Sequence, residues 1–179
     1  MRNIPLLLIL LLIINNGCSQ DNQSASNWSS LEYDYSNRPV SPQYQYRYTI
    51  KIDNKMNGSI RYSFAYDRPA QYVETKNFTI DEERMKLINE AIIHSKVMSE
   101  KIESLPTEKI PDGGHIKYFS ITLPTDDNQT KLISVPSHPV EEYQQILNNL
   151  YDVIDKSVPD DIWKDFEQKK EDYIKSQKD

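Results

Sequence analysis

The chain has 179 residues, of which 37% are hydrophobic and 27% charged, and this composition is compatible with one folded domain that has a small core. Its net charge of −6 argues against nucleic acid and anionic lipid headgroups as main partners, because both carry negative charge themselves. Cys18 is the only cysteine, which excludes an intrachain disulfide and a zinc cluster built from cysteines.

Residues 1–17 have the pattern of a targeting segment. Arg2 supplies a positive charge, and Ile4–Ile14 is apolar throughout except for Pro5. This apolar run is shorter than the roughly 20 residues that a membrane-spanning helix needs, but it suits the core of a signal peptide. We therefore expect residues 1–17 to be a signal peptide.

The residues Asn15-Asn16-Gly17-Cys18 follow that run and resemble the lipobox of bacterial lipoprotein precursors, with Asn15 where an apolar residue is usual. In that family, signal peptidase II cuts before the cysteine, which receives several acyl chains and so anchors stably. The resemblance implies lipidation at Cys18 and a place in the bacterial cell envelope, facing away from the cytoplasm. Ser19 favours the outer membrane in a Gram-negative host. The alternative is a free thiol in a secreted protein.

Residues 18–43 are rich in Ser, Asn and Gln, which predicts a flexible tether between the lipidated cysteine and a globular domain over residues 44–179. Several large side chains interrupt this polar stretch. These side chains are Trp28, Leu31, Tyr33 and Tyr35. We interpret them as loose linker residues rather than as groups that dock on the domain or on a partner.

Two stretches alternate strictly between apolar and polar residues, namely Tyr44–Ile52 and Ser59–Tyr66. A period of two with one apolar face predicts strands that are packed on one side and solvated on the other. Asn57-Gly58 predicts the turn between them. A weaker third strand is expected over Gln71–Asn77.

A helix is predicted over Thr79–Ser95, because Thr79 and Glu82 have the spacing of a capping box. Met85, Ile88 and Ile92 then fall on one side of the helix and are expected to face the sheet. The following residues are irregular, and Asp112-Gly113-Gly114 predicts a turn.

The C-terminal part repeats this order of elements. Strands are predicted over Ile116–Leu123 and Lys131–Val135, a helix from Pro139, and a last helix from Asp160 or Asp161. Short connections between strands favour antiparallel pairing. The expected fold is α+β, with a single antiparallel sheet of about four to five strands, helices on one face, and the order β-β-(β)-α-β-β-α-α.

No catalytic residue is assigned. The three histidines, His94, His115 and His138, lack the spacing of metal ligands, so we expect neither a metal nor a cofactor. The sequence contains no G-x-S-x-G motif and no glycine-rich phosphate loop. Asp112 and His115 are the one candidate surface site, as an Asp/His pair, although an ordinary tight turn explains the same residues.

The twelve tyrosines are the one compositional excess. Packing in the core is favoured because four of them alternate in phase with isoleucines; the alternative is a tyrosine-lined groove for a glycan or a peptide. The four are Tyr46, Tyr48, Tyr62 and Tyr66.

The layout over Ser59–Tyr66, Phe78–Ile92 and Asp112–Leu123 is similar to that of small bacterial lipoproteins whose domain has no known function. We hypothesise a lipid-anchored binding or interaction module of the envelope, with a protein or glycan partner. The alternatives are an inhibitor or immunity protein against a basic envelope-acting enzyme, and a cell-wall hydrolase. A deep pocket that gathers His115 with carboxylates would favour the enzyme, and an exposed aromatic surface would favour binding.

Overall fold

The computed structural model describes residues 27–38, 40–65, 72–127 and 129–177. The predicted signal peptide, Cys18 and Tyr66 lie outside these ranges. The predicted α+β fold is confirmed, with six strands in one antiparallel sheet of order β4-β3-β2-β1-β5-β6. The elements are β1 (Ser30–Ser36), β2 (Tyr46–Asp53), β3 (Asn57–Phe64), β4 (Val73–Thr79), α1 (Glu82–Ser95), β5 (Ile116–Pro124), β6 (Thr130–Val135), α2 (Glu141–Ser157) and α3 (Asp160–Ser176).

Strand β1 lies in the middle of the sheet, between β2 and β5. The flexible tether expected over residues 18–43 is therefore wrong for this stretch, and the domain begins before residue 44. Leu31 and Tyr33 are buried, as is Trp28 just before the strand, so the interpretation of these residues as loose linker side chains is also wrong. The physical reason is alternation: Leu31, Tyr33 and Tyr35 face the core, while Glu32 pairs with Lys51 on the other face.

The turn between β2 and β3 lies at Asn54–Met56, before the predicted Asn57-Gly58. Asp53 holds this turn, because its side chain accepts hydrogen bonds from the backbone N–H groups of Lys55 and Asn57, both at 2.9 Å. Gly58 instead belongs to β3, opposite Phe78 of β4. The Phe78 ring occupies the space that a Cβ at residue 58 would need, so the glycine permits a close approach here rather than a turn.

The N-cap of helix α1 lies two residues after Thr79, the N-cap that the capping-box spacing predicts. Asp81 is its N-cap, and the Asp81 carboxylate accepts from the Arg84 backbone N–H at 2.7 Å. Thr79 is the exposed end of β4. The predicted apolar side of the helix is correct, since Ile88 and Ile92 are fully buried and Met85 packs against the core.

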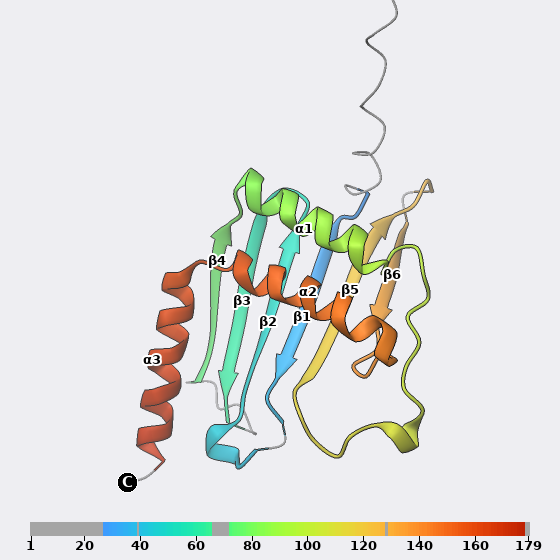
Figure 1. Cartoon of the computed structure of the whole chain (residues 1–179). Coiled ribbons are helices and arrows are strands. Elements are labelled where there is room, and N and C mark those ends of the chain that lie inside the picture. Colours follow the sequence, from blue (N-terminus) through green and yellow to red (C-terminus); the bar gives the residue numbers. More distant parts are fainter. Residues whose placement is uncertain (1–26, 39, 66–71, 128, 178–179) are drawn as a thin grey trace, which may run out of the picture.

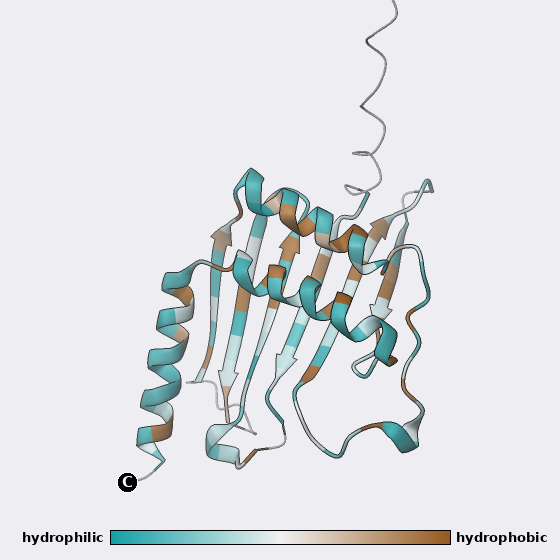
Figure 2. Cartoon of the chain, in the orientation of Figure 1, coloured by the Kyte–Doolittle hydropathy of each residue, from teal (hydrophilic) through white to brown (hydrophobic). Residues whose placement is uncertain are grey.

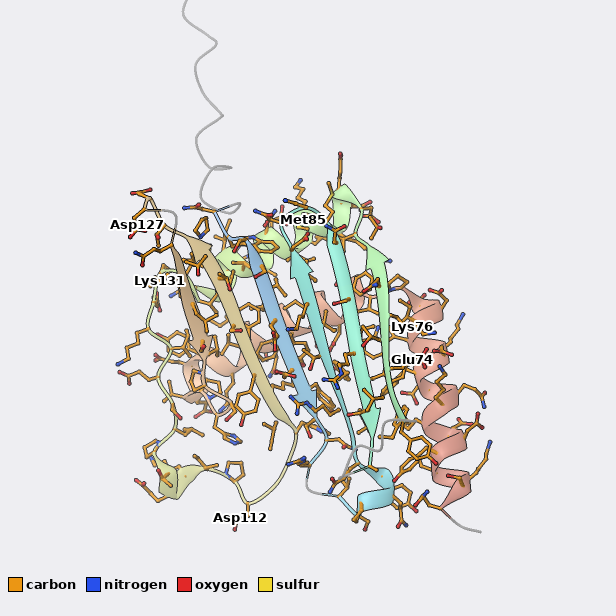
Figure 3. The ribbon with its side chains drawn as sticks, turned by 180° about the vertical axis from the view of Figure 1, so that it is seen from behind. Glu74, Lys76, Met85, Asp112, Asp127 and Lys131 are labelled. Carbon is orange, nitrogen blue, oxygen red and sulfur yellow. The ribbon has the colours of Figure 1, made fainter. Side chains whose placement is uncertain are left out.

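The three α-helices of the described chain lie on one face of the sheet, and Figure 3 shows the opposite face without an α-helix over it. Helices α1 and α2 cross the sheet side by side, while α3 runs along its β4 side (Figure 1). Figure 2 shows apolar residues concentrated where α1 and α2 cross the strands. No helix in the described residues combines the length and apolarity needed to cross a membrane.

Candidate functional site

Helix α2 crosses the sheet about midway along the strands, and neither α1 nor α2 covers the far ends of β1, β2 and β5 (Figure 1). On the helix side of this uncovered part, Tyr35 of β1 lies directly opposite Lys117 of β5 and Tyr48 of β2. His115 immediately precedes β5. Residues from three strands therefore meet at one end of the sheet, beside the candidate histidine.

The rings at this end form a stacked group. The Tyr35 ring stacks on Tyr48 with centroids 4.9 Å apart, on His115 at 5.3 Å and on Tyr46 at 5.8 Å. The Tyr35 hydroxyl and His115 Nδ1 are hydrogen-bonded at 2.7 Å. Tyr48 is buried, Tyr35 and Tyr46 are half-buried, and His115 is exposed. We call the three accessible rings, Tyr35, Tyr46 and His115, the aromatic ledge.

The structure does not join Asp112 to His115. Asp112 lies at the tip of its loop (Figure 3), and no hydrogen bond or ion pair links it to another residue of the described chain. Gly114 has a φ of 110°, which suits the tight-turn interpretation because glycine adopts such a backbone without strain. Within the described ranges, no group of three or more His, Cys, Asp and Glu side chains is placed to hold a metal ion.

A half-buried carboxylate lies directly behind the ledge. Asp155 of α2 accepts a hydrogen bond from the Tyr48 hydroxyl at 3.0 Å, and its backbone carbonyl accepts one from Trp163 Nε1 at 3.1 Å. Burial raises the pKa of Asp155 to about 6, against the opposing effects of the Tyr48 hydrogen bond and the Lys117 charge. The burial of Tyr48 and the nearby charge of Asp155 raise the pKa of the Tyr48 phenol well above its ordinary value. This phenol therefore stays protonated and remains a hydrogen-bond donor.

Another hydroxyl in this region is buried without a hydrogen bond. Tyr33 is fully buried and its ring stacks on Tyr151 of α2 with centroids 4.9 Å apart, yet its hydroxyl has no hydrogen-bond partner in the described chain. An unsatisfied buried hydroxyl lowers stability, and the stacked rings offset part of this loss.

Two lysines stand beside the aromatic group. Lys170 of α3 places its ammonium 5.1 Å from the centroid of the Tyr46 ring, and Lys117 places its own 5.3 Å from the centroid of Tyr151. Lys117 also donates to Asn148 Oδ1 at 2.9 Å. The arrangement can bind through ring edges, phenol groups and ammonium groups. It pairs the Tyr35 phenol with the His115 imidazole, but no carboxylate of the described residues bonds to that imidazole to orient it.

Sequence reasoning found His115 but missed its surroundings. The predicted tether includes Tyr35, whose contact with His115 depends on the β1–β5 register. The available signal was the alternation of Leu31, Tyr33 and Tyr35. For the tyrosines, the packing interpretation is correct for Tyr48 and Tyr62, which are buried, while Tyr46 is only half-buried.

The fold and the ledge define an α+β domain with an accessible aromatic surface at one end of its sheet. Compared with known proteins, the chain matches no protein-family model and no curated sequence.

Proposed function

We propose that this protein is a lipid-anchored binding module of the bacterial cell envelope, and that the aromatic ledge contacts its partner. The observation that carries the proposal is the exposed stacking of His115 on Tyr35, because accessible aromatic side chains are enriched at binding surfaces. Among the described residues, His115 contacts an aromatic ring and its phenol group rather than carboxylates, which favours binding over hydrolysis.

The position of β1 supports an arrangement relative to the membrane. Trp28, already buried against the domain, follows Cys18 by ten residues, and a chain of that length spans at most about 35 Å. Strand β1 then leads from its Ser30 end to Tyr35 at the opposite end of the sheet (Figure 1). An anchor at Cys18 would hold the domain close to the membrane with the ledge at its far end.

Site-specific photo-crosslinking in the native envelope tests the ledge. A photoreactive phenylalanine analogue in place of His115 should give a defined adduct, whereas the same analogue in place of Leu132 should not. Leu132 is the matched control because it is 64% exposed but lies on β6, on the open face of the sheet. Equal adducts at both positions, or none at residue 115, would contradict the proposed contact surface.

Metabolic labelling tests the anchor separately. The parent protein should incorporate a fatty-acid probe, and Cys18→Ser should lose the label because the acceptor sulfur is gone. Equal labelling of the two proteins would end the lipoprotein interpretation without affecting the crosslinking result.

A further inference from the structure

A cleft separates α3 from the β3–β4 side of the sheet. Its volume is about 310 Å³, at the lower end of the range for small-ligand sites. Strands β3 and β4 form one wall and α3 forms the other. The residues that line it combine aromatic rings with charged groups: Tyr62, Phe64, Tyr72, Glu74, Lys169, Asp172, Tyr173 and Ser176.

Three of these rings are arranged around the cleft. Phe64 and Tyr173 stack with centroids 6.0 Å apart, and Tyr72 meets Tyr173 edge to face at 4.7 Å. Phe64 and Tyr173 are buried and Tyr72 is half-buried. Ring faces carry partial negative charge, so a set of rings at different orientations attracts a cation.

An ion-pair network adjoins the cleft through two of its lining residues, Glu74 and Lys169. Glu74 is paired with Lys169 and, at 2.6 Å, with Lys76. Glu74 and Lys76 both belong to β4 and lie beside α3 in Figure 3. Lys169 is also 3.2 Å from Asp165, whose carboxylate accepts from the Tyr62 hydroxyl at 2.7 Å. These lysines lower the pKa of Glu74, so the carboxylate stays charged.

Asp172 adds a further carboxylate at the rim of the cleft. Its nearest ion-pair partner is Lys175 at 3.9 Å, and its side chain is 61% exposed. Asp172 also accepts from Gln168 at 3.0 Å. The residues that line the cleft therefore carry two carboxylates, Glu74 and Asp172, against one ammonium group, Lys169. An anion entering here would meet this excess of negative charge, whereas a cation would find both the rings and Asp172.

We propose that the cleft between α3 and β3–β4 binds the ammonium group of a lysine side chain presented by a basic partner protein. The ammonium would lie against the Tyr72 and Tyr173 rings and pair with Asp172 at the rim. This site is separate from the aromatic ledge and stands on its own contacts. It would suit an envelope protein that recognises a basic partner.

The test is a titration of the full chain in detergent with Nα-acetyl-lysine N-methylamide, followed by NMR. The matched probe is the norleucine analogue, which has the same side-chain length without the ammonium. Lysine amide should bind saturably and shift the signals of Tyr72 and Tyr173, and the norleucine analogue should bind at least tenfold more weakly. Equal binding of both probes, or no binding of the lysine amide, would overturn the proposal.

Two variants locate the binding. Asp172→Asn should weaken lysine binding at least fivefold, because it removes the rim charge without changing shape. Asp160→Asn, an exposed carboxylate at the start of the same helix, should leave the affinity within twofold of the parent. A Tyr72→Leu variant should also weaken binding while its melting temperature reports folding. Unchanged affinity in Asp172→Asn, or equal losses in the Asp172 and Asp160 variants, would overturn the assignment to this cleft.

Discussion

The two ends of the covered sheet face have different chemistry, although the same strands run through both. Under α1, the buried side chains are aliphatic apart from Trp28, and Ile50, Ile60 and Ile88 are 0% exposed. Beside α3 they are aromatic, with Phe166 surrounded by tyrosine and phenylalanine rings. Period-two alternation decides which side chains point inward. The residue type along each strand decides whether that part of the face is dry or carries polar groups.

Polar groups are tolerated at the aromatic end because the tyrosines bring hydroxyls with them. The Tyr48 hydroxyl bonds to Asp155, and the Tyr62 hydroxyl bonds to Asp165. Ring bodies bury apolar area while their hydroxyls satisfy neighbouring carboxylates. At the aliphatic end the Trp28 indole already donates to Asn89 Oδ1 at 2.9 Å, so a charge placed there would remain unpaired. Substitutions at the two ends should therefore have different consequences.

The largest effect is expected from Ile88→Asp at the aliphatic end. Ile88 is 0% exposed, and burying an unpaired carboxylate should lower the free energy of unfolding by more than about 4 kcal/mol. Since small domains are stable by about 5–15 kcal/mol, this variant should be largely unfolded. Urea titration followed by circular dichroism measures it. Glu90→Lys, on the exposed side of α1, is the control and should stay within about 0.5 kcal/mol; collapse of the control alone would mean that α1 is rotated.

Phe166→Ala should be the next largest change and probes the aromatic end. The ring is 2% exposed and lies 5.2 Å from Tyr62 and 5.4 Å from Phe64, centroid to centroid. Its removal should lower the free energy of unfolding by about 3–5 kcal/mol, because a cavity replaces the ring. The same urea titration applies. Leu87→Ala, at a side chain that is 49% exposed on α1, should change stability by less than about 1 kcal/mol, and a similar loss in both would show that α3 does not pack as described.

Asp155→Asn tests how ionisation of the carboxyl group behind the aromatic ledge affects stability. Burial raises the pKa of Asp155 from 3.8 to about 6, so proton binding stabilises the fold. That stabilisation is complete below about pH 4 and is lost as the pH rises through 6. Asparagine does not ionise, so the variant does not lose this stabilisation as the pH rises. The free energy of unfolding of the variant minus that of the parent should therefore increase by up to about 3 kcal/mol between pH 4 and pH 7.5. Urea titrations at these two pH values measure the change, and a constant difference would contradict it.

The smallest effect concerns the cap of α1. Asp81→Ala removes the acceptor for the Arg84 backbone N–H and should lower the free energy of unfolding by about 1 kcal/mol. Thr79→Ala, at the exposed end of β4, should change it by less than about 0.5 kcal/mol. Thermal melts of both variants rank them. The reverse order would restore Thr79 as the N-cap, as the capping-box spacing predicted.

The repeating patterns made most of the fold predictable. Alternation located β2, β3, β5 and β6, and the apolar stripes located the three helices, because these periods follow from backbone geometry alone. Strand β1 is not among the predicted strands, because the polar composition of residues 18–43 indicates a tether and hides its alternation. The turn before β3 lies earlier than the predicted Asn57-Gly58 because Asp53 forms it with its side chain, while Gly58 makes room for the Phe78 ring.

The candidate site was only partly predictable. His115 could be selected as a histidine beside a turn, but its partner Tyr35 is 80 residues away in sequence. Their contact follows from β1 pairing with β5 in a particular register, which local patterns do not determine. The raised pKa of Asp155 likewise arises from burial by elements distant in sequence, so no motif could indicate it.

The central position of β1 has a consequence for the order in which the chain can fold. Strand β1 is synthesised before every other strand of the described sheet, yet its β5 partners follow about 80 to 90 residues later. Until β5 arrives, β1 offers an unpaired edge flanked by the apolar side chains of Leu31, Tyr33 and Tyr35. In a nascent chain this edge of β1 should therefore stay unpaired until Ile116–Pro124 has emerged, and β5 pairing should limit the folding rate.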